Sequence, residues 1–268
     1  MKTAPPIVLT VAGSDPSGGA GLQAALKTIH QHGAYGAAVP TLITVQDSVE
    51  VGRVELLPVD LVRAQLSALL SDLAPAAAKA GALGSPETVR ALGAVMEETP
   101  FSWVVDPVWL PSRGVPLSTG DTIAAYKDAV LPHAALLTPN ASEAGALAEM
   151  PVRTLDDARA AAERIAAFGA EAVLIKGGHL EGADRGTDVL LHRGELDVLK
   201  ADAIVPGRFH GTGCALSAAI ASRIAFGVRL AAAVEGAKAW LAGALAHAFP
   251  VGRGAKPANH LWPLDEKP

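Results

Sequence analysis

The sequence predicts an α/β protein in which a central, mostly parallel sheet lies between two layers of helices. Short apolar segments alternate with segments of helical period along most of the 268 residues, and this alternation is typical of parallel sheets with right-handed crossovers. Half of the residues are hydrophobic and 18% are charged, which is enough apolar material to cover both faces of a sheet. Without a repeat or a low-complexity linker, we expect one domain over 1–268 with a C-terminal tail at about 252–268.

The predicted strands are short, apolar and bounded by glycine, proline or polar residues. They are Ile7–Val11, Gly36–Val45, Ala76–Ala80, Trp103–Asp106, Ala135–Thr138 and Ala172–Lys176. Helices are predicted at Gly21–His32, Val59–Leu73, Pro86–Glu98, Thr122–Val130, Ser142–Glu149, Leu155–Phe168, Ala215–Phe226 and Leu230–Phe249. The turn signal Arg193-Gly194 predicts a small edge hairpin from Asp188–Leu191 and Glu195–Lys200, and Val49–Leu56 indicates a further short strand.

The charge and cysteine content exclude several classes of protein. The formal net charge is −5 and basic residues are scattered singly, so we expect no nucleic-acid partner. One cysteine cannot build a disulfide framework, and the apolar helices are interrupted by charges, so we predict a cytoplasmic protein without a membrane partner. Most histidines lack the spacing of metal ligands and are interpreted as surface or loop residues: His30, His32, His133, His192, His247 and His260.

The segment Phe209–Cys214 is the most informative motif. It combines a glycine-rich turn with the start of an apolar helix, so free backbone N–H groups converge where an anion can bind. Cys214 is the only cysteine of the chain, and the positive helix end favours its thiolate as a base or nucleophile. Such a site suits phosphoryl transfer. The alternative is that Gly211 and Gly213 make a tight turn and Cys214 is a small buried residue.

Other polar residues follow the predicted strands, at the edge where ligands bind in open α/β sheets. Asp106 suits a metal or a substrate, or it caps a turn. Asn140 and Glu143 stand three apart at a helix start, where they suit a metal-bound water near phosphates or form a capping pair. Lys176 closes a buried strand beside two glycines, which favours contact with phosphate oxygens.

The segment Gly19–Ala24 matches the G-x-G-x-x-A pattern of dinucleotide-binding proteins. That hypothesis requires an acidic residue closing the second strand, and Asp47 is displaced from that position. The preceding Asp15–Gly18 also lengthens the loop, and a P-loop lysine pattern is absent from the sequence. The nicotinamide hypothesis is therefore disfavoured.

Four motifs occur together, in order, within a chain segment from about Ile7 to Phe249. They are Ala12–Ala24, Thr138–Ala144, Lys176–His179 and His210–Cys214. Together they closely resemble the hydroxymethylpyrimidine/phosphomethylpyrimidine kinases of thiamine biosynthesis, in the ribokinase-like superfamily. The resemblance implies a ribokinase-like three-layer αβα sandwich and a homodimer. It also implies Mg-ATP-dependent phosphorylation of 4-amino-5-hydroxymethyl-2-methylpyrimidine and then of its monophosphate.

The resemblance also implies roles for individual residues. Cys214 takes the proton of the substrate hydroxyl, and the transferring phosphoryl group meets the N–H groups of Gly211, Thr212 and Gly213. Gln46 pairs with the amino group and the adjacent ring nitrogen of the pyrimidine. The other implied site residues are Gly13 and Val108 for the pyrimidine, Lys176 and Asn140 for ATP, and Asp106 and Glu143 for magnesium.

The sequence departs from the family pattern near the pyrimidine site. Ala25 stands where the family has an aspartate, and Trp109 where it commonly has methionine, while Asp47-Ser48 replaces Asn-Thr. These changes predict a reshaped pocket and a preference for the monophosphate substrate. A pyridoxal or pyridoxine kinase shares the frame and the cysteine but is disfavoured by Gln46. A catalytically silent binding protein of the same fold is a further alternative, which the complete Cys214 loop disfavours.

Overall fold

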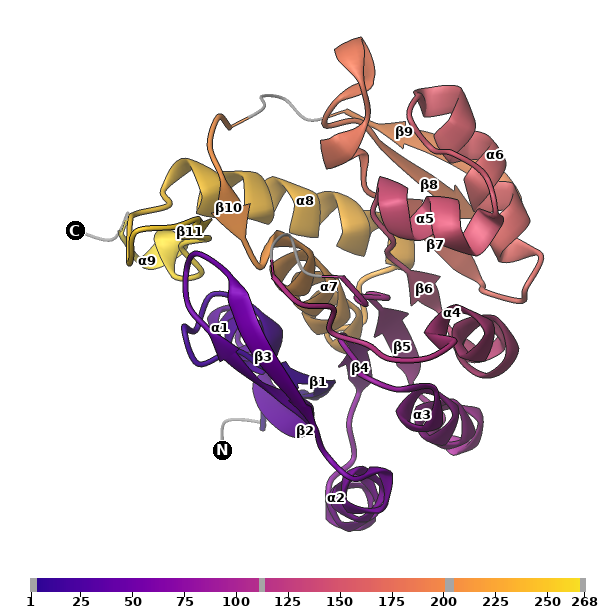
Figure 1. Ribbon diagram of the computed structural model, residues 1–268, viewed down its shortest axis with the longest axis vertical. Coiled ribbons are helices and arrows are strands. Elements are labelled where there is room, and N and C mark those ends of the chain that lie inside the picture. Colours follow the sequence, from indigo (N-terminus) through magenta and orange to yellow (C-terminus); the bar gives the residue numbers. More distant parts are fainter. Residues whose placement is uncertain (1–3, 111–113, 201–204, 266–268) are drawn as a thin grey trace.

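The computed structural model describes residues 4–110, 114–200 and 205–265 (Figure 1). Within these residues one sheet has nine strands, in the order β3 (Val51–Leu56), β2 (Tyr35–Gln46), β1 (Ile7–Ser14), β4 (Ala77–Ala80), β5 (Ser102–Val105), β6 (Leu136–Leu137), β7 (Ala172–Ile175), β8 (Asp188–His192) and β9 (Glu195–Leu199). From β2 to β7 the neighbouring strands are parallel, whereas β3 and the β8–β9 hairpin are antiparallel additions at the two edges. The predicted sheet and its edge hairpin are confirmed.

Helices cover both faces of the sheet (Figure 1). One layer contains α2 (Val59–Asp72), α3 (Pro86–Glu98), α4 (Thr122–Ala125), α5 (Ala141–Ala148) and α6 (Leu155–Ala166), and the other contains α1 (Gly21–Gln31), α7 (Thr212–Ala225) and α8 (Leu230–Ala246). Strand side chains alternate between the two cores: Leu9 packs in the α2–α6 core and Val8 in the α1, α7 and α8 core. This is the predicted three-layer sandwich. No helix in the described part of the chain is long and apolar enough to cross a membrane.

Local sequence explains how several elements begin and end. Ser85 caps α3 with its side chain and Pro86 occupies the first turn, while Thr154 and Asp157 form a capping box at α6. The predicted helix at Thr122–Val130 instead contains α4 followed by a π-helical turn at Tyr126–Val130. In the β8–β9 hairpin, Arg193 and Gly194 have positive φ angles, as a primed turn requires.

The predicted tail at 252–268 is partly structured. β11 (Lys256–Pro257) pairs with β10 (Phe209–His210), and α9 (Trp262–Asp265) follows. Trp262 stacks on the ring of His247, and its indole N–H donates to the carbonyl of Trp240. These contacts join distant parts of the chain, so the composition of the segment does not reveal them. His260, interpreted as a surface or loop residue, is buried, and burial lowers its pKa to about 4.

Lys79, in β4, carries a buried side-chain amine. Its side chain is fully buried, and Nζ has no hydrogen-bond partner among the described residues. Because burying an amine without a partner costs free energy, we expect Lys79→Met to raise the free energy of unfolding by about 1–3 kcal/mol. Chemical denaturation at neutral pH measures this change. A loss of stability of similar size would show that the amine is a favourable part of the fold.

Candidate functional site

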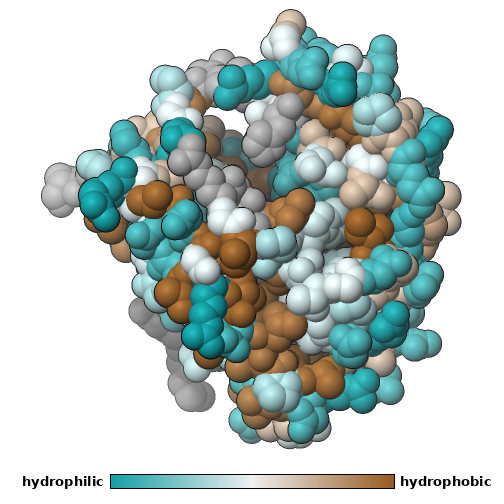
Figure 2. All heavy atoms as spheres, in the orientation of Figure 1, coloured by the Kyte–Doolittle hydropathy of each residue, from teal (hydrophilic) through white to brown (hydrophobic). Residues whose placement is uncertain are grey.

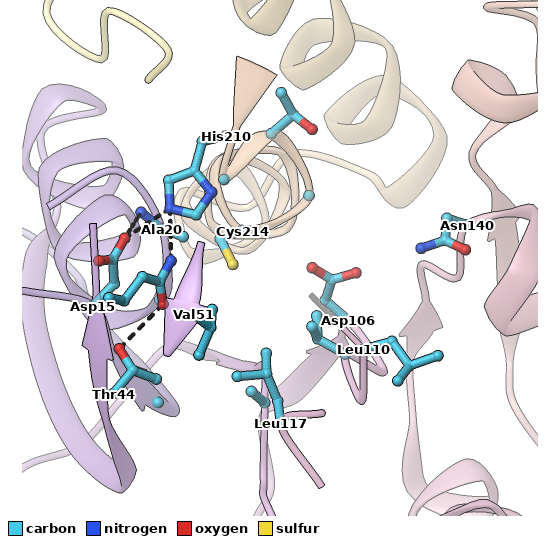
Figure 3. A pocket seen from close by; sticks show the side chains of 18 of the residues that line it. Asp15, Ala20, Thr44, Val51, Asp106, Leu110, Leu117, Asn140, His210 and Cys214 are labelled. Atoms are coloured by element: carbon cyan, nitrogen blue, oxygen red, sulfur yellow. Dashed lines mark hydrogen bonds and ion pairs between the residues drawn. The ribbon is translucent and has the colours of Figure 1, made fainter. Parts of the chain in front are cut away.

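The carboxyl ends of the parallel strands and the start of α7 enclose a cavity (Figure 3). This is the edge where open α/β sheets bind ligands. Every residue to which the sequence analysis gives a role lines this cavity: Gly13, Gln46, Asp106, Val108, Asn140, Glu143, Lys176, Gly211, Thr212, Gly213 and Cys214. The fold thus brings the predicted site residues together, and their individual roles stay predictions.

The start of α7 forms one end of the cavity. Gly211 precedes the helix with a φ of 74°, and a Cβ there would lie 1.9 Å from the carbonyl oxygen of Gly19, so the position requires glycine. Gly211 has no side chain that could cap α7, and no side-chain cap hydrogen bond is found there among the described residues, which leaves the first-turn N–H groups available to an anion. Figure 3 shows Cys214 with its sulfur directed toward the open centre of the cavity.

A buried cluster of charges faces that helix start. Lys176 Nζ lies 2.5 Å from Asp106 Oδ1 and 4.0 Å from Glu143 Oε2. Burial lowers the pKa of Lys176, but the carboxylates of Asp106 and Glu143 raise it more, so the net pKa is raised and the ammonium stays charged. A Cβ at Gly213 would lie 2.9 Å from Asp106 Oδ2 and 3.0 Å from Lys176 Nζ. Glycine therefore lets α7 approach the cluster closely.

The donor set of this cluster fits magnesium bound together with phosphates. Asp106 Oδ2 is buried and has no hydrogen-bond partner among the described residues, so one carboxylate oxygen is free to meet a cation. Mg²⁺ usually takes only one or two protein carboxylates and completes its shell with water and phosphate oxygens. The described residues hold no group of three or more His, Cys, Asp or Glu side chains that could bind a metal ion.

Asn140 and Glu143 form the capping pair that their spacing predicts as one of two alternatives. Asn140 Oδ1 accepts hydrogen bonds from the N–H groups of Ser142 and Glu143, and Glu143 Oε2 accepts one from the Asn140 N–H. The capping box starts α5 at the mouth of the cavity. Both side chains also line the cavity, so the capping pair lies at the site itself.

The raised pKa of Glu143 predicts that the stability of the protein depends on pH. Burial raises the pKa of Glu143 to about 7; Asp106 acts in the same direction, whereas Lys176 and the Asn140 N–H act against it. Because this pKa exceeds the ordinary value of 4.5, the stabilising contribution is complete below about pH 4.5 and is lost as pH rises through 7. Glu143→Gln stays neutral and can still accept from Asn140. We expect its stability relative to wild type to increase between about pH 5 and pH 8 in magnesium-free denaturation experiments; a pH-independent difference would contradict this.

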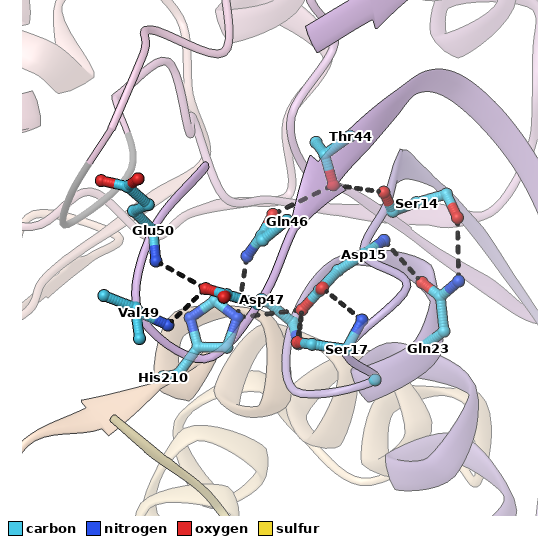
Figure 4. A network of polar contacts seen from close by, with 12 residues as sticks. Ser14, Asp15, Ser17, Gln23, Thr44, Gln46, Asp47, Val49, Glu50 and His210 are labelled. Atoms are coloured by element: carbon cyan, nitrogen blue, oxygen red, sulfur yellow. Dashed lines mark hydrogen bonds and ion pairs between the residues drawn. The ribbon is translucent and has the colours of Figure 1, made fainter. Parts of the chain in front are cut away.

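A polar network that the sequence analysis did not assign lies beside Gln46 (Figure 4). His210 Nε2 lies 2.9 Å from both Asp15 Oδ2 and Gln46 Nε2. Thr44 Oγ1 lies 3.1 Å from Gln46 Oε1 and donates to the carbonyl of Ser14. The only sequence signal for a role of His210 was its position inside the Phe209–Cys214 motif, because this segment precedes a helix at the edge of the sheet where ligands bind.

Two family departures do not alter the cavity wall directly. Ala25 is fully buried in the core shared by α1, α7 and α8, and Trp109 packs near Tyr126 in the opposite core. Neither residue lines the cavity, whereas Leu42, Val51 and Leu117 do. The departures at Ala25 and Trp109 therefore do not reshape the pocket through direct contact: α1 turns the side chain of Ala25 into the helix layer, and the chain turns Trp109 inward after Val108. The preference for the monophosphate substrate stays a prediction.

Comparisons with known proteins agree with this site. A family model described as phosphomethylpyrimidine kinase matches residues 15–259. A hydroxymethylpyrimidine/phosphomethylpyrimidine kinase from Synechococcus elongatus is 40% identical over 259 residues, covering 97% of this chain and 98% of its own.

Two solved structures extend the comparison. The phosphomethylpyrimidine kinase of Clostridium difficile is 34% identical, with a TM-score of 0.78 over 88% of this chain and 98% of that one. The pyridoxal kinase of Staphylococcus aureus, in complex with AMP-PCP and pyridoxal, is 33% identical, with a TM-score of 0.88 over 97% of this chain and 94% of that one.

The covered parallel sheet and the glycine-rich helix start facing an Asp–Lys pair define a small-molecule kinase of the ribokinase-like kind. The family model and the Synechococcus elongatus relative both match most of the sequence, and they identify the family within this class. The chain belongs to the phosphomethylpyrimidine kinase family.

Proposed function

We propose that this enzyme uses ATP to phosphorylate 4-amino-5-hydroxymethyl-2-methylpyrimidine and its monophosphate, giving the diphosphate needed for thiamine biosynthesis. One observation carries the proposal: Gln46, Cys214 and the Asp106–Lys176 pair line the same cavity. An amide suited to an aminopyrimidine, a thiol suited to take a hydroxyl proton and a lysine suited to phosphate thus share one site. The kinase relatives support the same reaction.

The proposed mechanism assigns the two ends of the cavity to the two substrates. Gln46 binds the ring edge of the pyrimidine, with Gly13 and Val108 lining the pocket. Cys214 accepts the proton of the hydroxymethyl group while the oxygen of that group attacks the γ-phosphorus of ATP. The bond between the γ-phosphorus and the oxygen that bridges it to the β-phosphate breaks, and ADP leaves. The N–H groups of Gly211, Thr212 and Gly213 stabilise the charge of the transferring group.

The remaining roles concern the nucleotide and its metal. Lys176 binds ATP phosphates from its buried position and Asn140 lies alongside them, while Asp106 and Glu143 hold Mg²⁺. When bound, Mg²⁺ neutralises charge on the phosphate oxygens. Asp106 Oδ2, which is buried and has no hydrogen-bond partner in the part of the chain that the structure describes, supports this assignment.

A homodimer in the cytoplasm is also part of the proposal. Large apolar side chains are exposed on β2 and β3, with Ile43 49%, Val45 62% and Leu56 37% exposed. Figure 2, in the orientation of Figure 1, shows apolar side chains gathered near the middle of the visible face, on which β2 and β3 lie. An apolar patch of this kind favours association with another protein surface.

Steady-state assays with ATP and each pyrimidine substrate test the proposed function. We expect transfer to the hydroxymethylpyrimidine or its monophosphate, and no transfer to either would refute the function. Pyridoxal belongs in the same assay, because the likeness to the Staphylococcus aureus pyridoxal kinase makes pyridoxal or pyridoxine phosphorylation the second candidate. We expect the pyrimidine to be preferred, since the Gln46 amide matches its amino group and ring nitrogen.

A further inference from the structure

The terminal amide of Gln46 is held between two side chains on its inner edge (Figure 4). One of its two atoms meets His210 at 2.9 Å and the other meets Thr44 at 3.1 Å. An amide has an oxygen that only accepts and a nitrogen that only donates. The hydrogens of His210 and Thr44 therefore determine which amide atom belongs on which side.

The Gln46 amide atom that faces His210 must be a hydrogen-bond acceptor. Asp15 Oδ2 also accepts hydrogen bonds from Ser17 Oγ and the Ala20 N–H. Burial raises the pKa of Asp15, but hydrogen bonds from His210 and Ser17 lower it more, so its net pKa is lowered and the carboxylate is ionised at neutral pH. An ionised carboxylate only accepts, so the proton between Asp15 and His210 lies on His210 Nε2. A protonated ring nitrogen cannot accept from the Gln46 amide, and only the amide oxygen suits this contact.

The Gln46 amide atom that faces Thr44 must be a hydrogen-bond donor. The hydroxyl of Thr44 has one hydrogen, and Oγ1 lies 2.9 Å from the carbonyl oxygen of Ser14. A carbonyl only accepts, so that hydrogen is used there. Toward Gln46 the hydroxyl then offers a lone pair, and the amide NH₂ is the group that satisfies it. Both neighbours thus lead independently to the same orientation.

We propose that Gln46 operates with its amide oxygen toward His210 and its NH₂ toward Thr44, and that this fixed polarity selects pyrimidines with a 4-amino group. The orientation is reached by a half-turn of the terminal amide that keeps both contacts. The inference rests on the proposed function. On its outer edge, the oxygen accepts from the exocyclic amine and the remaining N–H donates to the adjacent ring nitrogen.

A 4-oxo pyrimidine presents the opposite pattern, with an acceptor in place of the amine and an N–H in place of the ring nitrogen. Pairing with it would turn the Gln46 amide around and disrupt its contacts with His210 and Thr44. Thr44 and His210 are therefore positioning residues, which act on specificity through Gln46. The same reasoning makes Asp15 the group that keeps the proton on His210 Nε2.

The test compares kcat/KM for the 4-amino substrate and its 4-oxo analogue. We expect wild type to favour the amino compound by at least roughly a hundredfold, because a buried polar site rejects a mismatched partner strongly. Thr44→Val should reduce that preference by about tenfold, since one of the two anchors is removed, whereas Thr44→Ser keeps the hydroxyl and should retain the preference. Equal use of the two compounds by wild type, or an unchanged preference in Thr44→Val, would overturn the inference.

Neutron diffraction on the unliganded wild-type protein tests the polarity independently of activity. We expect deuterons on His210 Nε2 and on the Gln46 atom that faces Thr44. Deuterons on the Gln46 atom that faces His210 would overturn the inference. Absence of transfer to any pyrimidine would instead refute the proposed function, and the deuteron positions would then decide the polarity alone.

Discussion

Cys214→Ala is expected to lower kcat by roughly a hundredfold to ten-thousandfold, the range for loss of a general base. The sulfur is directed into the cavity, and Cys214 lies in the first turn of α7. Without the thiol, no side chain at that position takes the hydroxyl proton, whereas the contacts that bind the pyrimidine and ATP stay in place. We therefore expect KM values close to those of wild type in steady-state assays.

Cys214→Ser is the matched control for packing. Serine keeps the size of the side chain but is a much poorer base at neutral pH, so its kcat should also fall strongly. Thermal unfolding of both variants shows whether the fold is retained. Near-normal turnover of a folded Cys214→Ala protein would remove Cys214 from the mechanism.

Lys176→Met is expected to lower kcat/KM for ATP by roughly a hundredfold to a thousandfold, because a preorganised positive group at the phosphates is lost. The variant should also lose about 3–5 kcal/mol of stability, since Asp106 keeps a buried charge without its partner. The side chains of Asp106 and Lys176 are 1% and 16% exposed, so water replaces little of that interaction. Kinetics at saturating pyrimidine and chemical denaturation measure the two effects.

The double variant Lys176→Met with Asp106→Asn separates the two effects. Removing both charges should restore much of the stability, because no unpaired buried charge remains. Activity should stay low, since both the phosphate contact and the metal ligand are absent. Recovery of activity along with stability would show that Lys176 serves only to balance Asp106.

The frame of the protein was predictable because its signals are local. Buried parallel strands produce short apolar runs, and capped helices between them produce a helical period, so residues at strand ends such as Asp106 and Lys176 were predicted to share one edge. Contacts between distant segments left no such pattern. β10 and β11 are separated by the 45 residues 211–255 and are only two residues each, too short for a periodic signal.

The same limit applies within the site. Asp15 and His210 are 195 positions apart, and neither the strand ends nor the motif spacing indicates that they form a pair. The sequence also did not indicate that Ala25 and Trp109 lie in the two cores, because a family motif gives a residue type and position but not the face of the element on which it lies. The face on which each residue lies depends on how α1 and the loop after β5 pack, which is a property of the whole fold.

The most direct test of the central claim is a crystal structure with 4-amino-5-hydroxymethyl-2-methylpyrimidine and a non-hydrolysable ATP analogue. It should place the hydroxyl oxygen within hydrogen-bond reach of Cys214 Sγ, the ring edge on Gln46, and the terminal phosphate on the N–H groups at the start of α7. A pyrimidine bound elsewhere, or a terminal phosphate far from Cys214, would contradict the account.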